Sequence, residues 1–276
     1  ASHMGLQYPG EVIVVSRWND AWGQELTDDS YFRIVLLTSL QRSFNVALRD
    51  ARIVVCIPAQ DVLHHRRDLD RELRSIAEAK GLYTVGRQSD TSALRSTLDR
   101  REAEIRDEFL EGCSLSYRAG RIRNTVDMDG EAVSIFASQY PALWLQGLAG
   151  AILARVYPTL TVDSSKFKRT LLKADLSALF DVLLADAPQA PGQEDIISFA
   201  VGLGLAQKAD PSAFDPGDCA VFRLIRQEID NKGSRIPVPD LARLLGHSYG
   251  LPLPLVALFL LAFVKYSHSE TELDLA

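Results

Sequence analysis

The chain has 276 residues, of which 47% are hydrophobic and 24% are charged, a balance that is typical of a folded globular protein and excludes a disordered chain. Its net charge of -6 gives no general attraction for nucleic-acid backbones, so binding to nucleic acid would need a local basic face. The cysteines lie far apart without CxxC spacing, which indicates buried, reduced thiols in a cytoplasmic protein and disfavours a metal site: Cys56, Cys113 and Cys219.

The N-terminal part of the chain, residues 5–90, is expected to form a small α/β layer. Residues 1–4, ASHM, are typical of a remnant of tag cleavage, and we set them apart from the fold. Two β-branched runs, EVIVVS from Glu11 and ARIVVCIP from Ala51, predict buried strands. Between them, apolar residues at steps of four predict a helix and hence a parallel βαβ unit: Phe32, Leu36, Leu40, Phe44 and Leu48.

Polar residues follow the two expected strands. Gln60 and Asp61 come after the second strand, and in open α/β sheets ligands bind at the carboxyl ends of parallel strands. We therefore take Gln60 and Asp61 as candidate catalytic residues, with Ser16 and Asp20 beside them at the end of the first strand. The alternative is that these residues simply form polar turns.

Residues 64–123 are rich in arginine, with 13 Lys and Arg against 11 Asp and Glu. Mixed charges at this spacing favour solvated helices with ion pairs four residues apart, the second helix being capped near Asp90 to Ser92. The alternative is an arginine cluster that contacts phosphate groups. The candidate nucleic-acid-binding residues are Arg118, Arg121 and Arg123, within a wider set that includes Arg95, Arg100 and Arg101.

A helical domain is expected over residues 91–187. The apolar stretch from Ser134 predicts one or two buried helices broken at Pro141 and Pro158. The stretch from Leu171 to Asp186 predicts an amphipathic helix. After it, APQAPGQED at residues 187–195 fits neither periodicity and predicts a linker and a domain boundary.

Residues 188–276 are expected to form a winged-helix-like module. The stretch at 197–214 fits either a helix or a strand. Glycine and proline positions then predict three consecutive helices, and ETELDL at 270–275 alternates as a terminal strand does. This order of elements is typical of a winged helix. The three helices are expected at Pro216 to Gly233, Val238 to Gly250 and Pro252 to Ser267.

The last helix is apolar on nearly all sides. Its apolar run, Leu251 to Val264, is shorter than the about 20 residues that cross a bilayer, so we expect a core helix rather than an anchor. It also lacks side chains that read DNA bases, and residues 201–276 carry 7 basic against 9 acidic residues. Any exposed side is expected to pack on the rest of the protein or on a partner. The expected core positions are Leu255, Leu258, Phe259, Leu261 and Ala262.

No complete catalytic motif occurs in the sequence. GxxxxGK[ST], HExxH, GxSxG and a GxGxxG after a strand are all missing. The first strand has the apolar residues of a Walker B strand, but Ser16 and Arg17 stand where two acidic residues would hold magnesium. We therefore expect no metal and no cofactor in this chain, and no ATP hydrolysis by it.

Several segments together resemble the later part of the large P-loop ATPases of the PglY and BrxC type, which belong to bacterial BREX and phage-growth-limitation defence systems. They are the strand that ends in Gln60 and Asp61, SYRAGRI from Ser116, VYPTL with SSKFKRTLL from Val156, and SYGLPLPLVALFLLAF from Ser248. By this resemblance Gln60 occupies a sensor-like position.

The resemblance implies a non-catalytic portion of a defence-associated ATPase that docks on other defence-system proteins or on the parent ATPase core. ATP would then belong to a larger parent. Independently of the resemblance, the cysteines favour a cytoplasmic location, and the residues predict neither a membrane segment nor a signal peptide. Two alternatives stay open. One is a winged-helix DNA-binding module that uses the arginine-rich segment, with weak binding, and the other is an enzyme with an unrecognised site at the strand ends.

Overall fold

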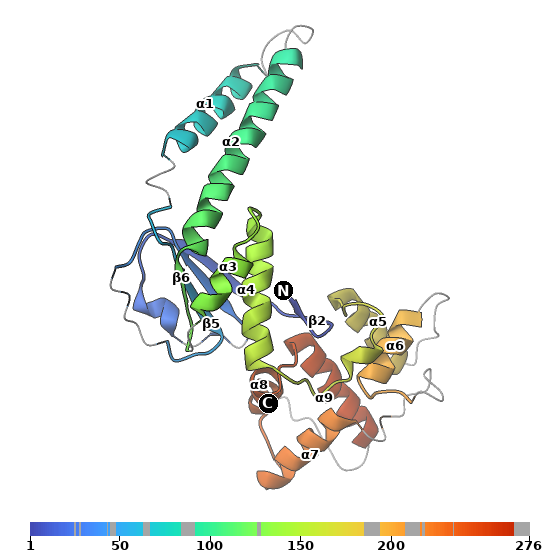
Figure 1. Cartoon of the computed structure of the whole chain (residues 1–276). Helices are drawn as coiled ribbons and strands as arrows, with labels where there is room; N and C mark the ends of the chain where they lie inside the picture. The colour runs from blue at the N-terminus through green and yellow to red at the C-terminus, as the bar shows by residue number, and fades with distance from the viewer. Residues whose placement is uncertain are drawn as a thin grey trace. The chain divides into compact units, whose positions relative to one another are not determined.

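The structure is a computed structural model of the whole chain, and its residues group into two compact units (Figure 1). The helical unit comprises Ala1–Gly10, Leu26–Tyr31 and Leu153–Ala276, and the sheet unit comprises Glu11–Glu25 and Phe32–Ile152. The residues that the structure describes are 1–24, 26–27, 29–42, 44, 48–62, 67–83, 92–125, 128–184, 194–207, 216, 219–233 and 235–267.

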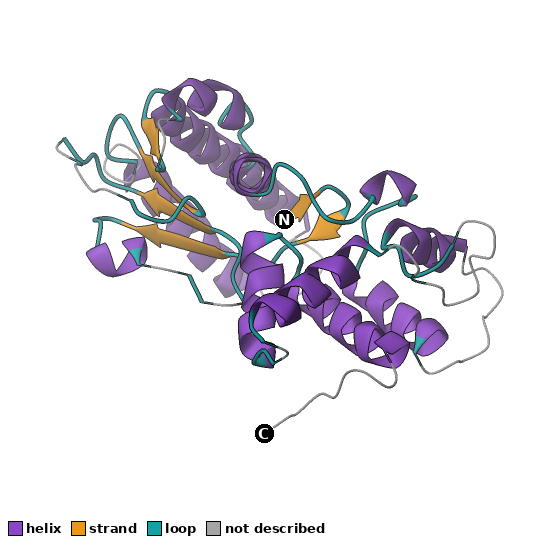
Figure 2. Cartoon of the chain, turned by 90° about the horizontal axis from the view of Figure 1, so that it is seen from below, coloured by secondary structure: helices purple, strands orange, loops and turns teal. Residues whose placement is uncertain are grey.

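A four-stranded sheet forms the core of the sheet unit (strands orange in Figure 2). The strand order is β3-β4-β5-β6, with the first three strands parallel and β6 antiparallel to β5. Every residue of β4 and β5 is buried, as expected for strands covered on both faces. The strands are β3 (Glu11–Val15), β4 (Arg33–Leu37), β5 (Ile53–Ile57) and β6 (Arg121–Arg123).

The prediction of a helix over Phe32 to Leu48 is wrong. The run RIVLL at Arg33–Leu37 is strand β4, which pairs with strands on both sides. A central parallel strand can be apolar at every position. Such a run also contains apolar residues four positions apart, and these match the apolar face of a helix. The described residues between β3 and β4 include a short 3-10 turn, η1 (Asp20–Gly23).

The prediction that the first strand is buried is also wrong. β3 lies at the edge of the sheet, and Val12 and Val14 are 44% and 61% exposed. The second strand was predicted correctly, because β5 is buried along its whole length.

Two long helices, α1 (Arg67–Tyr83) and α2 (Ser92–Arg118), lie side by side as a hairpin (Figure 1). Ion pairs follow their surfaces, including Arg74 with Asp70 and Arg106 with Glu102, each four residues apart. This confirms the prediction of solvated helices with such pairs. The described part of α2 begins at Ser92, directly after the undescribed residues 84–91, so the predicted cap near Asp90 to Ser92 stays a prediction.

Helices α3 (Asp129–Ile135) and α4 (Pro141–Val156) follow β6, and the boundary between the two units falls inside α4. Pro141 opens α4 and the helix ends shortly before Pro158, so the predicted breaks at the prolines are confirmed. In the sheet unit Phe136 and Trp144 pack their rings against Tyr117 at the end of α2.

The helical unit starts with a small antiparallel hairpin, β1 (Ser2–His3) and β2 (Leu6–Gln7), so the residues set apart from the fold take part in it. Its helices include α5 and α7, which match the predicted helices closely, and α7 is closed by Gly233 at φ +77°. The helices are α5 (Lys173–Leu183), α6 (Glu194–Gly202), α7 (Ala220–Asn231), α8 (Val238–Arg243) and α9 (Leu253–Ser267).

Two regions named in the sequence analysis fall largely outside the described residues. The proposed linker covers residues 187–195, of which only Glu194 and Asp195 are described, and these open α6. The proposed terminal strand at 270–275 is not described at all. The boundaries at 90/91 and 187/188 therefore stay predictions.

The turn that leads into α9 is held by buried tyrosines of the helical unit. The Tyr8 hydroxyl donates to the Gly250 carbonyl at 2.8 Å, and the Tyr31 hydroxyl donates to the Leu251 carbonyl at 2.7 Å. Gly250 has φ +70°, and a Cβ there would lie 2.6 Å from the ring of Tyr157. Only glycine fits at this point, so the turn fixes where α9 begins.

Candidate functional site

Both candidate catalytic residues make contacts inside the sheet unit. The Gln60 amide donates to the Ser116 hydroxyl at 3.3 Å, and an Asp61 carboxylate oxygen accepts the backbone N–H of Leu40 at 2.5 Å. These contacts tie the loop after β5 to the end of α2 and to the loop after β4. Such roles stabilise the edge of a sheet without needing a ligand.

The other strand-end residues are similarly engaged. The Asp20 carboxylate accepts the indole N–H of Trp18 at 2.8 Å, and the Ser16 carbonyl accepts from the Gln41 side chain at 3.4 Å. Arg121 also reaches this edge, where it donates to the Gln41 carbonyl at 3.2 Å. Gln41 was missed by sequence reasoning, because it follows β4 and that strand was taken for a helix.

Among the described residues, the strand ends do not assemble a recognisable reaction centre. Among the contacts of Ser16, Asp20, Gln60 and Asp61 there is no pairing of a nucleophile with a base, which covalent catalysis would require. Over the described part of the chain, no three His, Cys, Asp or Glu side chains gather in a group that could hold a metal ion. The three cysteines are buried, as the sequence predicts, and none of them forms a disulfide bond.

The three candidate nucleic-acid-binding arginines do not act as one group. Arg118 donates to the carbonyls of Phe136 and Ala137, at 3.2 Å and 2.8 Å, and thereby covers the end of α3. Arg121 and Arg123 lie two residues apart in β6 and thus on the same face, with Arg121 bound to Gln41. An arginine that satisfies backbone carbonyls is less available to phosphates, so weak DNA binding stays a prediction.

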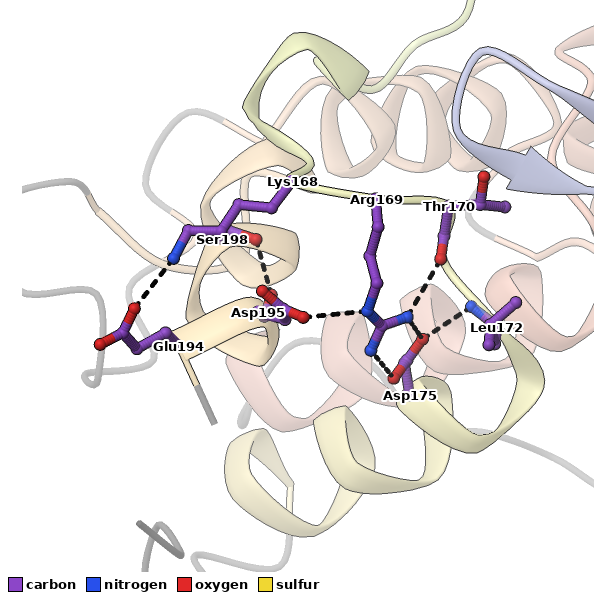
Figure 3. A network of polar contacts seen from close by, with 8 residues as sticks. All are labelled: Lys168, Arg169, Thr170, Leu172, Asp175, Glu194, Asp195 and Ser198. Atoms are coloured by element: carbon purple, nitrogen blue, oxygen red, sulfur yellow. Dashed lines mark hydrogen bonds and ion pairs between the residues drawn. The ribbon is translucent and has the colours of Figure 1, made fainter. Parts of the chain in front are cut away.

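A polar network in the helical unit joins α5 to α6 (Figure 3). The guanidinium of Arg169 makes two parallel bonds of 2.7 Å to the Asp175 carboxylate and a third, of 2.9 Å, to Asp195. Asp175 also accepts the backbone N–H of Leu172 at 2.8 Å and thus caps α5. Bidentate geometry on a carboxylate that is only 10% exposed makes this a strong ion pair.

The hydrogen bonds from Arg169 hold the pKa of Asp175 below its ordinary value. A depressed carboxyl pKa stabilises the folded state above the unfolded pKa of about 3.9, and that contribution is lost as the pH falls through the folded pKa. We expect Asp175→Asn to cost about 1.5 to 3 kcal/mol at pH 7, and the difference from the unmodified protein to shrink between about pH 5 and pH 2. Denaturant unfolding at a series of pH values measures this.

The matched control is Glu194→Gln, which removes an exposed carboxylate from the same network (Figure 3). Glu194 is 84% exposed and bonded to Lys168, so its loss should cost less than about 1 kcal/mol. If the difference in the free energy of unfolding between Asp175→Asn and the unmodified protein were the same at every pH, the assigned role of this carboxylate would be contradicted.

Helix α9 has a buried face and an exposed apolar face. Leu255, Leu258, Phe259 and Ala262 are buried, as predicted, and the helix packs against α5, α7 and α8. Leu261 was predicted to be in the core, and this is wrong, because it is 43% exposed. The error arises because a helix that is apolar all round gives no sign of which side faces inward.

We define the α9 stripe as the exposed side of this helix. Its members recur every three to four residues, and Leu253 is 42% exposed. The basic residue of α9 itself, Lys265, donates to the carbonyls of Leu183 and Leu184 at the end of α5. The stripe therefore contains no charge over its length. Its members are Leu253, Pro254, Ala257, Leu260, Leu261 and Val264, with Leu260 and Val264 only partly exposed.

The described helices include none that is both long and apolar enough to cross a bilayer. Comparison with protein-family models, with curated proteins and with solved structures returns no match.

Proposed function

We propose that this chain is a non-catalytic, protein-docking portion of a bacterial anti-phage-defence ATPase, and that the α9 stripe is its docking face. The observation that carries the proposal is the stripe itself. A row of exposed apolar side chains with no charge, on a helix whose other side is anchored in a core, is typical of a surface that a partner covers.

The proposal also fits what surrounds α9. The tyrosine-held turn at Gly250 and the contacts with α5, α7 and α8 make the stripe part of a firmly placed helix. A preorganised face loses little conformational freedom on binding, which favours affinity. The strand-end residues, in contrast, are engaged in contacts with other segments of the sheet unit.

The finer architecture belongs to the same proposal. Helices α7, α8 and α9 follow one another in the order of a winged helix, and α8 continues through a π-helical turn, Leu244–Ser248, towards α9. In this arrangement α9 would serve as a docking helix rather than as a reader of DNA, since the stripe offers no donors to bases. Buried cysteines that form no disulfide bond support a cytoplasmic setting.

The partner we propose is a protein that carries a P-loop, either the parent ATPase core or another protein of the same defence system. ATP would be bound there. Co-expression with the proteins encoded beside this chain, followed by purification through a tag on this chain, should retain a P-loop protein. Leu261→Glu should lower the retained amount at least about tenfold, because it places a charge in an apolar contact.

The matched control is Leu94→Glu in α2, because Leu94 is 40% exposed and Leu261 is 43% exposed. This variant should retain the partner in full. Equal loss in both variants would indicate a general effect of the added charge. Full retention by Leu261→Glu, or the retention of no P-loop protein by the unmodified chain, would refute the proposal.

A further inference from the structure

Strand β3 leaves an open edge on the sheet. β3 pairs only with β4 in the sheet order, and bonds at its two ends join Glu11 to Phe32 and Thr38 to Val15. Alternate residues of a parallel strand bond to the same neighbour, so Glu11, Ile13 and Val15 bond to β4. Val12 and Val14 then direct their backbone N–H and C=O groups to the open edge, and no bond from another described residue reaches them there.

Among the described residues, this edge shows none of the features that usually prevent an exposed strand from pairing with a strand of another molecule. Such strands are usually blocked by lysine, proline, a bulge or a covering segment. β3 reads EVIVV, its single charged residue Glu11 is bonded to Arg33 at 2.7 Å, and Val12 and Val14 are 44% and 61% exposed. Both the hydrogen-bonding groups and the apolar side chains of the edge are thus presented to solvent.

We propose that β3 pairs with β3 of a second copy of this chain, in antiparallel orientation about a two-fold axis at Ile13. In this register Val12 lies opposite Val14 of the second copy and exchanges two backbone hydrogen bonds with it, and the symmetric pair does the same. The four valines then meet on one face of a continuous sheet, where apolar cross-strand pairs stabilise each other.

The placement of charge supports a second copy as the occupant. Glu11, the one charged residue of the strand, lies opposite the apolar Val15 of the second copy in this register. The two glutamates are therefore held apart at opposite ends of the paired strands, and no like charges face each other. A strand with this pattern is compatible with pairing to itself.

The first test is the oligomeric state of the whole chain by sedimentation over a range of concentrations. We expect a dimer whose dissociation constant rises at least about tenfold in Val14→Lys, because lysine on an edge strand opposes pairing. The matched control is Val133→Lys in α3, since Val133 is also 61% exposed and should leave the dimer unchanged. A monomeric protein, or equal effects of the two variants, would overturn the proposal.

The second test examines the register. Under mild oxidation Ile13→Cys should form a disulfide-linked dimer, because the two copies of residue 13 face each other as a non-hydrogen-bonded pair with Cα atoms about 4.5 Å apart. Val12→Cys should cross-link far less, because its two copies are diagonal, about 7 to 8 Å apart. The native cysteines are buried and do not compete. Preferred cross-linking of Val12→Cys would exclude this register.

The two-fold pairing is independent of the docking proposal, because β3 and α9 belong to different units. Leu261→Glu should leave the dimer intact, and Val14→Lys should leave the retained P-loop partner intact. If Val14→Lys instead released a strand of a different protein while this chain stayed monomeric, the open edge would belong to that protein and the proposed pairing would be wrong.

Discussion

Leu258→Asp is expected to unfold the helical unit, because Leu258 is 3% exposed on the buried side of α9. An aspartate there would lose the apolar contacts of the leucine and would bury a carboxylate without a partner. Truncation to alanine at a buried leucine costs about 2 to 5 kcal/mol, and the charged variant should cost more, against a total stability of about 5 to 15 kcal/mol. Circular dichroism during thermal unfolding gives the measurement.

Leu261→Asp is the matched control, three residues further along the same helix. Leu261 is 43% exposed, so the carboxylate stays in water and the melting temperature should change little. The two variants together test the division of α9 into a buried face and a stripe. If both melted like the unmodified protein, Leu258 would have to be accessible to water, and the described packing of α9 would be wrong.

Gly120→Ala is expected to have the largest effect in the sheet unit. Gly120 lies between α2 and β6, and a Cβ there would be 2.1 Å from the carbonyl oxygen of Ile57 in β5. The neighbouring atoms are backbone, so no side chain can turn aside to relieve the overlap. The start of β6 would have to move away from β5, which we expect to cost about 3 kcal/mol or more in the free energy of unfolding. Urea unfolding measures this cost.

Gly150→Ala serves as its control, because a Cβ at Gly150 meets nothing within 4 Å. Gly150 lies inside α4, where alanine should raise stability by about 0.5 to 1 kcal/mol. The same chemical change is thus expected to have opposite signs at the two positions. A Gly120→Ala protein as stable as the unmodified one would contradict the close approach of this turn to β5.

For the two candidate residues Gln60 and Asp61, the residue pattern predicted the position in the chain but not the contacts. Polar residues after an apolar run correctly place Gln60 and Asp61 in the loop after β5, because a strand must end where its side chains can no longer be buried. Their partners Ser116 and Leu40 are 56 and 21 residues away. Contacts over such separations depend on how the chain folds back, and no local pattern encodes them.

The sequence by itself determined the elements with strong local signals. Alternating charges marked α1 and α2, prolines marked the start and end of α4, and Gly233 marked the end of α7, because these features act within one or two helical turns. It also determined the general character of α9. The helix is too short to cross a bilayer, and it is so apolar that most of its sides must pack against protein.

Only the tertiary structure decided which apolar segments are surrounded and which remain open. Neighbours on both sides made RIVLL a central strand, whereas the similar run EVIVV became an edge with Val12 and Val14 exposed. In α9 the positions of α5, α7 and α8 decided that Leu258 is covered and Leu261 is not. Burial depends on residues distant in sequence, and segments that are apolar at every position carry no periodicity that would reveal their outer face.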